Sequence, residues 1–100
     1  MSSEKSVNLT IELTGIATDI AGQKEVHIQL TPQQTYHDVV EILADKYPDL
    51  VNILIAPDRN TFLSSNLFII NDEMNDPVFF MDKHPRDGDR LTLVSVMTGG

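Results

Sequence analysis

Cysteine is absent from this sequence of 100 residues. Its absence excludes a disulfide framework, a metal site built on cysteine and catalysis by a side-chain thiol. If a protein of this sequence handles sulfur, it therefore has to carry the sulfur somewhere other than on a side chain.

Basic residues are scarce, with 7 lysines and arginines against 15 acidic residues and a net charge of -8. This charge repels phosphate backbones and anionic membranes, and it favours a partner with a basic face. Residues 1–6 contain no apolar core of signal-peptide length, and no apolar run is long enough to cross a bilayer. We therefore expect a cytoplasmic protein that binds neither nucleic acid nor a membrane.

Catalytic motifs are lacking as well. The sequence shows no phosphate-binding glycine loop and no pattern typical of a catalytic triad. His27, His37 and His84 fall on a predicted strand, a predicted helix and a predicted loop, a distribution too sparse for a metal site. We expect no bound metal, no bound cofactor and no enzyme activity of the chain's own.

What the sequence does contain is hydrophobic periodicity of the length expected for one domain over residues 1–100. Apolar and polar residues alternate over 7–14 and again over 26–30, which predicts two strands with one buried face each. Residues 15–25 include two glycines and are interpreted as a loose connection. The two strands are predicted to pair as a hairpin.

An amphipathic helix is predicted to follow the hairpin. Thr35 and Asp38 form an acidic variant of the capping box, apolar residues then recur at helical spacing, and Pro48 ends the pattern. Residues 50–54 favour a short second helix that begins at Asp49 and closes at Pro57, although a strand is the alternative.

The remaining elements are predicted as strands. Residues 58–66 are interpreted as a loop, 67–70 as a strand, 78–81 as a brief edge strand and 90–97 as the closing strand. Helices gathered on one face of a mixed sheet, with the first and last strands parallel at its centre, make an α+β domain. This is the β-grasp arrangement, with one main helix and a short second helix.

The closing stretch is the most distinctive part of the chain. A turn at 87–89 leads into a strand that ends shortly before Gly99 and Gly100. Glycines can pass through a channel too narrow for a side chain, so this tail could present a terminal carboxylate to a distant reactive centre. The alternative is a flexible tail without a role, or a scar from expression.

The closing strand is predicted to carry apolar residues on both faces. Leu91 and Leu93 point one way, whereas Val94 and Val96 point the other way and form a candidate docking patch. The alternative is that Val94 and Val96 are present because central strands favour β-branched residues.

The turn and strand from Asp87 to Val96, the strand ending in Ile70-Asn71 and the final Gly99-Gly100 together resemble the ubiquitin-like sulfur carriers. This is the MoaD/ThiS family, which includes the molybdopterin synthase small subunit and the thiamine-biosynthesis carrier. The resemblance implies that an E1-like activating enzyme uses ATP to adenylate the carboxylate of Gly100, which is then converted to a thiocarboxylate. Thr98 and Gly99 would lie in the partner's channel.

The resemblance leaves the pathway open. Molybdenum cofactor biosynthesis, with the large subunit of molybdopterin synthase as a partner, is the first expectation. Thr98 stands where the family usually has alanine, serine or glycine, and the loop at 58–66 makes this chain longer than compact thiamine carriers. A carrier for the thiamine or cysteine pathway, and a ubiquitin-like protein modifier that forms isopeptide bonds, remain alternatives.

Overall fold

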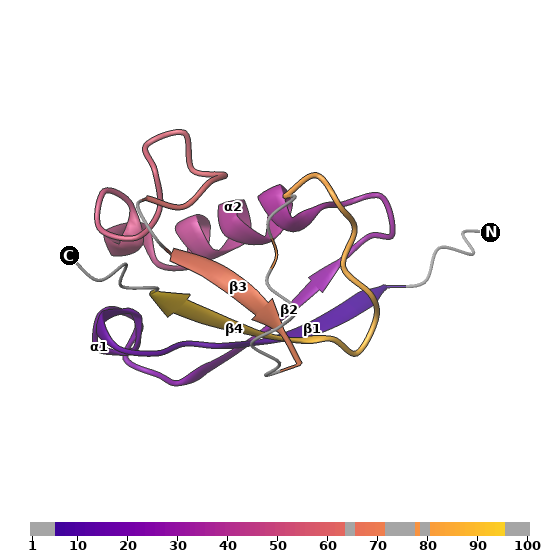
Figure 1. Cartoon of the computed structure of the whole chain (residues 1–100), viewed down its shortest axis with the longest axis horizontal. Helices are drawn as coiled ribbons and strands as arrows, with labels where there is room; N and C mark the ends of the chain where they lie inside the picture. Colours follow the sequence, from indigo (N-terminus) through magenta and orange to yellow (C-terminus); the bar gives the residue numbers. More distant parts are fainter. Residues whose placement is uncertain (1–5, 64–65, 72–77, 79–80, 96–100) are drawn as a thin grey trace.

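The computed structural model describes residues 6–63, 66–71, 78 and 81–95. These residues form one four-stranded sheet, two α-helices and a 3-10 turn (Figure 1). In chain order the elements are β1 (Val7–Glu12), α1 (Ile16–Ala21), β2 (Glu25–Leu30), α2 (Tyr36–Lys46), the 3-10 turn η1 (Pro48–Leu50), β3 (Asn66–Ile70) and β4 (Arg90–Ser95). Within the described ranges, no helix combines the length and the apolar character needed to span a membrane.

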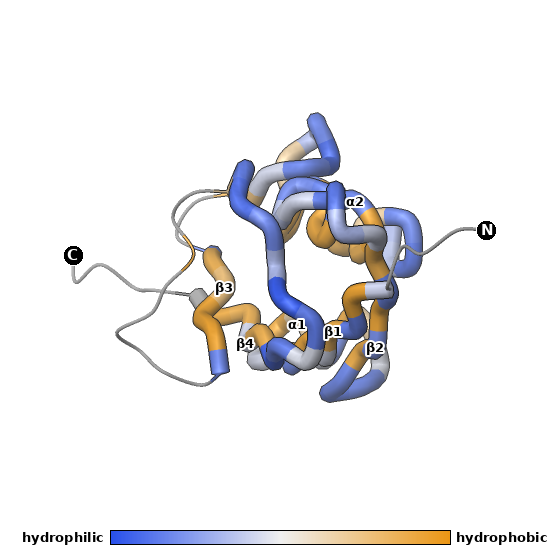
Figure 2. The backbone as a smooth tube through the Cα atoms, turned by 90° about the vertical axis from the view of Figure 1, so that its right-hand side faces the viewer, coloured by the Kyte–Doolittle hydropathy of each residue, from blue (hydrophilic) through white to orange (hydrophobic). Residues whose placement is uncertain are grey.

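The sheet has the strand order β2-β1-β4-β3, with β1 and β4 at its centre. β1 pairs antiparallel with β2 and parallel with β4, and β3 pairs antiparallel with β4. The long helix α2 lies across one face of this sheet (Figure 2). The predicted hairpin, the parallel central pair and the α+β class are therefore confirmed.

The core lies between α2 and the face of the sheet that α2 covers. Val39, Val40 and Leu43 of α2 are fully buried, and alternate residues of each strand pack against them. Phe68 of β3 lies within this core, with its ring centroid 4.9 Å from that of Phe62. Each such side chain contributes about 1.5 to 3 kcal/mol when fully buried, so this layer holds the sheet and helix together.

The start of α2 follows the predicted capping box. The backbone N–H of Thr35 donates to Asp38 Oδ2 at 2.8 Å, and the Thr35 side chain caps the backbone of Asp38 in return. The helix ends at Lys46, just before Pro48 opens the 3-10 turn. Both predicted ends of the helix are confirmed.

The predicted loose connection at residues 15–25 is wrong in part, because it contains the helix α1 and the first residue of β2. α1 has only six residues and closes at Gly22, whose φ of 76° is in the left-handed region that glycine favours. β1 also ends at Glu12, two residues earlier than predicted.

The predicted short helix over residues 50–54 is also wrong. The 3-10 turn starts earlier, at Pro48, where the fixed φ of proline suits the first helical position. The chain then turns back so that Ile55 bridges both Val51 and Phe62, and Ile55 becomes fully buried. Neither a helix nor a regular strand therefore forms over this segment.

The predicted loop that begins at Asp58 is held by local hydrogen bonds in its described part. Asp58 Oδ1 accepts bonds from the backbone N–H groups of Asn60, at 3.0 Å, and Thr61, at 3.2 Å. These donors hold the pKa of Asp58 below its ordinary value. Arg59 Nη2 donates to Asp45 Oδ1 of α2 at 2.6 Å, which ties the loop to the helix.

Two predicted strand segments fall partly beyond what the structure describes. Of the predicted edge strand at 78–81, residues 79–80 lie outside the described residues. Val78 is not in a strand, although its N–H donates to the Phe68 carbonyl at 2.8 Å. The predicted extension of the closing strand to Met97 lies outside as well.

Candidate functional site

The predicted turn before β4 is present and is anchored to the start of β1. Gly88 has a φ of 87°, a conformation that favours glycine, and its N–H donates to the Asn8 carbonyl at 2.8 Å. Asp87 Oδ1 accepts a bond from the Asn8 N–H, also at 2.8 Å. These contacts set the register in which β4 runs parallel to β1, with Thr10 opposite Arg90.

At the start of β4, Arg90 links three strands on the sheet face away from α2. Its Nη2 donates to Glu12 Oε2 at 2.5 Å and to Glu25 Oε2 at 2.7 Å. The hydrogen bond and the charge of Arg90 lower the pKa of Glu25, and the two carboxylates raise the pKa of Arg90. All three side chains are more than a third exposed, so water screens these ion pairs.

Along β4 the side chains alternate as predicted. Leu91 and Leu93 are buried in the core at 0% and 2% exposure. Val94 lies on the opposite face, is half-buried and pairs with Leu67 of β3. The structure thus places the described member of the predicted docking patch on the open face.

The other predicted site residues lie outside the described residues. They are Val96 of the docking patch, Thr98 and Gly99 of the predicted channel segment, and Gly100 as the predicted attachment point. What the structure defines is the strand that leads to them, which is central in the sheet and runs to Ser95.

The open face of the sheet is divided into two halves of different character. In the half formed by β3 and β4, Leu67 and Val94 are half-buried neighbours, whereas Ile69 at 5% exposure and Thr92 at 6% are buried. The half formed by β1 and β2 is polar, with Asn8, Thr10, Glu12, Glu25, His27 and Gln29. Among the described residues of this face, the apolar side chains that stay partly exposed are Leu67 and Val94, in the first half.

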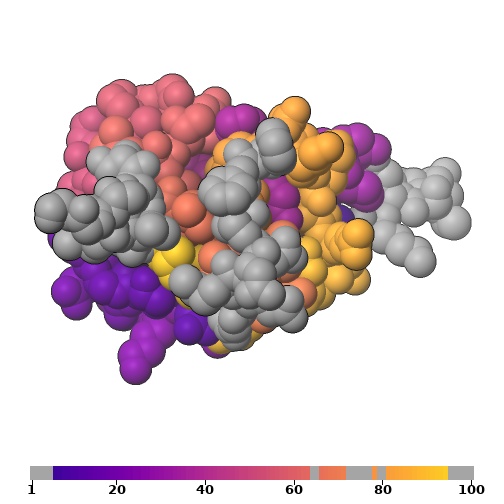
Figure 3. Space-filling model, in the orientation of Figure 1, coloured from indigo at the N-terminus to yellow at the C-terminus, as the bar shows by residue number. Residues whose placement is uncertain are grey.

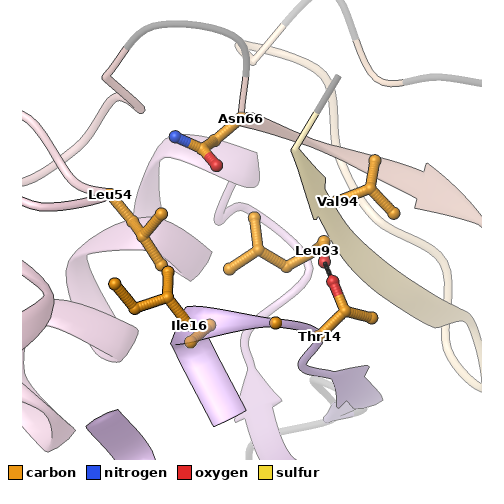
Figure 4. A pocket seen from close by; sticks show the side chains of 8 residues that line it. Thr14, Ile16, Leu54, Asn66, Leu93 and Val94 are labelled. Atoms are coloured by element: carbon orange, nitrogen blue, oxygen red, sulfur yellow. Dashed lines mark hydrogen bonds between the residues drawn. The ribbon is translucent and has the colours of Figure 1, made fainter. Parts of the chain in front are cut away.

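At the carboxyl end of β4, a side chain replaces the neighbouring strand. β1 stops at Glu12, so the parallel pairing ends at Thr92. Beyond that point, the hydroxyl of Thr14 donates to the Leu93 carbonyl at 2.7 Å (Figure 4). This bond holds the end of β4 against the β1–α1 turn.

A cleft of about 350 Å³ opens beside the same end of β4. In the close-up, Ile16, Leu54 and Leu93 approach one another from three different segments (Figure 4). The surface view shows the yellow atoms near the end of β4 between the purple β1–α1 region and the pink region that follows α2 (Figure 3). The full lining consists of Thr14, Gly15, Ile16, Ala17, Leu54, Asn66, Leu93 and Val94.

Reasoning from the sequence missed this cleft, because its walls come from segments predicted as a loose connection and a short helix. One signal was available in the sequence, where the apolar Ile16 directly follows Gly15. The structure places Ile16 at the start of α1, where it is 53% exposed.

The described histidines engage in hydrogen bonds with other segments of the chain. His37 Nδ1 lies 2.7 Å from the Asn60 carbonyl oxygen, and His84 Nδ1 lies 3.0 Å from the Gln34 carbonyl oxygen. Across the described ranges, no three histidine, aspartate or glutamate side chains gather as metal ligands.

Comparison with known proteins assigns this architecture to a family. A model of the ThiS family matches residues 11–100, from near the end of β1 through Gly100. The chain belongs to the ThiS family. Among curated proteins, none matches the chain by sequence.

Solved structures share the fold at low sequence identity. SAMP1, a small archaeal modifier protein from Haloferax volcanii, superposes with a TM-score of 0.75 and 19% identity, covering 93% of this chain and 99% of its own. A Pyrococcus furiosus protein provisionally assigned as molybdopterin converting factor, subunit 1, gives 0.70 and 14%, with 91% and 99% covered. Urm1 from Trypanosoma brucei gives 0.65 and 24%, with both chains fully covered.

These matches confirm the predicted ubiquitin-like β-grasp fold and the predicted resemblance to the ThiS/MoaD sulfur carriers. At these identities the structural likeness concerns the fold alone.

Proposed function

We propose that this chain is a sulfur carrier activated at the carboxylate of Gly100. The observation that carries the proposal is the ThiS-family match, which extends through Gly99 and Gly100. The central strand β4, held in the sheet on both sides, supplies a rigid base for such a tail. A carboxyl-terminal carrier needs both a glycine tail and an anchored strand that presents it.

The proposed chemistry begins with activation of a weak electrophile. A carboxylate oxygen of Gly100 attacks the α-phosphorus of ATP, and pyrophosphate leaves with the electrons of the broken P–O bond. A sulfur nucleophile such as hydrosulfide then attacks the carbonyl carbon of the acyl-adenylate, and AMP leaves. The thiocarboxylate carries sulfur on the main chain, which suits a protein without cysteine.

In this proposal the catalytic groups belong to the partners. ATP is bound by an E1-like adenylating enzyme, and this chain is its substrate without a cofactor of its own. Thr98 and Gly99 would occupy the narrow approach to that active site, because a glycine backbone passes where a Cβ would collide. Val94 and Val96 would form the docking patch on the open face.

Molybdenum cofactor biosynthesis is the proposed destination of the sulfur. The similarity to the Pyrococcus furiosus protein assigned as a molybdopterin converting factor subunit favours this pathway. The second partner would then be the large subunit of molybdopterin synthase. A thiamine or cysteine pathway would use the same activated tail with a different acceptor.

A second candidate function is protein modification, favoured by the similarity to SAMP1, a small archaeal modifier protein. Activation would be the same, but a lysine amine of a target protein would attack the acyl-adenylate or a thioester made from it. The product would be an isopeptide bond at Gly100.

Intact mass spectrometry of the protein purified from its own cells tests the proposal. We expect a species heavier by the difference between sulfur and oxygen, located on Gly100 by fragmentation. Incubation with the adenylating enzyme, ATP and sulfide should increase this species. Added mass on a side chain, or isopeptides with other proteins as the only product, would contradict the sulfur-carrier function.

A further inference from the structure

Ile16 is the more exposed of two large apolar side chains that stand out on the described surface, the other being Ile53 at 48%. Single exposed apolar residues are common on proteins and need no explanation. Ile16, however, lies at the cleft beside the end of β4, where it adjoins Leu54 and Leu93 (Figure 4).

The cleft is suited to an apolar occupant. Leu54, Leu93 and Ala17 are almost completely buried beneath it. The hydroxyl of Thr14 donates to the Leu93 carbonyl, so this polar group at the cleft already has a hydrogen-bond partner. A volume of about 350 Å³ is at the small end of the range for ligand pockets and has room for one or two side chains.

The length of the chain beyond β4 limits where a partner can bind. Five residues follow Ser95 up to Gly100. Fully extended, five residues span at most about 18 Å. An enzyme that acts on the carboxylate of Gly100 must therefore bring its surface close to the end of β4, which is where the cleft opens.

We propose that the cleft receives an apolar side chain of the adenylating enzyme, and that Ile16 packs against that side chain. This inference rests on the proposed function. It assigns a contact on the α1 side of β4, formed by Ile16, Leu54 and Leu93. This contact adjoins the docking patch, because Val94 also lines the cleft. The Ile16 contact anchors the enzyme beside the tail that it has to hold.

The test uses the variant Ile16→Asp and the adenylating enzyme isolated through its activity on the wild-type chain. Aspartate is favoured in the first turn of a helix, so this variant should fold. We expect the KM for the carrier in adenylate formation to rise about tenfold or more, as for loss of an interface anchor. The kcat at saturating carrier should stay within about twofold, because the tail itself is unchanged.

Two control variants introduce the same negative charge as Ile16→Asp at other positions. Gln33→Asp lies in the exposed turn after β2, at the opposite end of the sheet, and should leave the KM within about twofold of wild type. Ile53→Asp changes a residue of similar exposure that does not line the cleft, and it should affect the KM less than Ile16→Asp.

The outcomes separate this inference from the proposed function. Absence of adenylate on the wild-type chain would remove the function and the inference together. Adenylation of the wild type with an unchanged KM for Ile16→Asp would overturn the inference alone. An equal loss in Ile53→Asp would also overturn it, as would wild-type dimers that Ile16→Asp abolishes, since the occupant would then be a second copy.

Discussion

The two ends of β4 are built in different ways. At its start, Gly88 and Asp87 bond to Asn8 of β1, and Arg90 bridges Glu12 of β1 and Glu25 of β2. At its end, β3 still pairs with β4 as far as Ser95, but the parallel partner has stopped. On that side the Thr14 hydroxyl donates to the Leu93 carbonyl beside an open apolar cleft.

The start of β4 therefore contributes to the stability of the fold, whereas its end presents the tail and apolar surface to a partner. The start of β4 is enclosed by backbone contacts and ion pairs that fix the register of the central strands. Its end exposes apolar surface on two sides, with Ile16 at the cleft and Val94 on the open face. Changes at the start should therefore act on folding, whereas changes at the end should act on partners.

The largest expected effect comes from Gly99→Ala, beyond the end of β4. If Gly99 passes through a narrow channel, the added Cβ displaces the carboxylate of Gly100, and a misplacement of about 1 Å can lower a reaction rate about 100-fold. We expect adenylate formation to fall by at least that factor, measured by ATP–pyrophosphate exchange. The melting temperature should be nearly unchanged.

The matched control is the glycine at the start of β4. Gly88→Ala forces alanine into a φ of 87°. Among the described residues, nothing beyond the two chain neighbours of Gly88 lies within 4 Å of the new Cβ, so backbone strain is the expected cost. The free energy of unfolding should fall by about 1 to 2 kcal/mol, while the folded variant is adenylated normally. Wild-type adenylation of Gly99→Ala would remove the main support for a channelled tail.

A smaller effect is expected from Val94→Asp on the open face. Loss of an apolar anchor in a buried interface should weaken binding to the adenylating enzyme by about 1 to 3 kcal/mol, roughly ten- to a hundredfold in Kd. Isothermal titration calorimetry on the purified pair measures this loss.

Gln29→Asp is the control for Val94→Asp, because it introduces the same side chain on the polar half of the same face. It should change the Kd less than Val94→Asp does. Unfolding of Val94→Asp would show that Val94 belongs to the core. An equal loss of affinity in both variants would show that charge alone weakens the complex.

The same contrast explains what could be predicted from the sequence. Strand alternation, the capping box of α2 and the turn around Gly88 are local patterns with a known period or a known backbone requirement, and all three are confirmed. The helix α1 was missed because six residues are less than two helical turns, too few to show a period.

The cleft and the ion-pair network could not be predicted for a different reason. Glu12, Glu25 and Arg90 are far apart in the sequence, and they meet only because the strand register places them side by side. Ile16 and Leu54 likewise come together through tertiary packing. The tail residues were predicted from composition and position, and Val94 from alternation, which places it on a face without naming its partner.

The smallest expected effect concerns the start of β4. Arg90 holds the pKa of Glu25 below its ordinary value of 4.5, so the ionised carboxylate stabilises the folded state. This contribution is fully present above pH 4.5 and is lost as the pH falls through the lowered pKa. Glu25→Gln should therefore lower the melting temperature slightly at pH 7, and the difference from wild type should shrink as the pH falls below 4.5. Added salt should also reduce this difference in melting temperature, because Glu25 and Arg90 are both exposed.

Glu41→Gln, an exposed position on α2 outside this network, serves as the control. A difference that stays constant down to pH 3 would mean that Glu25 acts through packing and not through its charge.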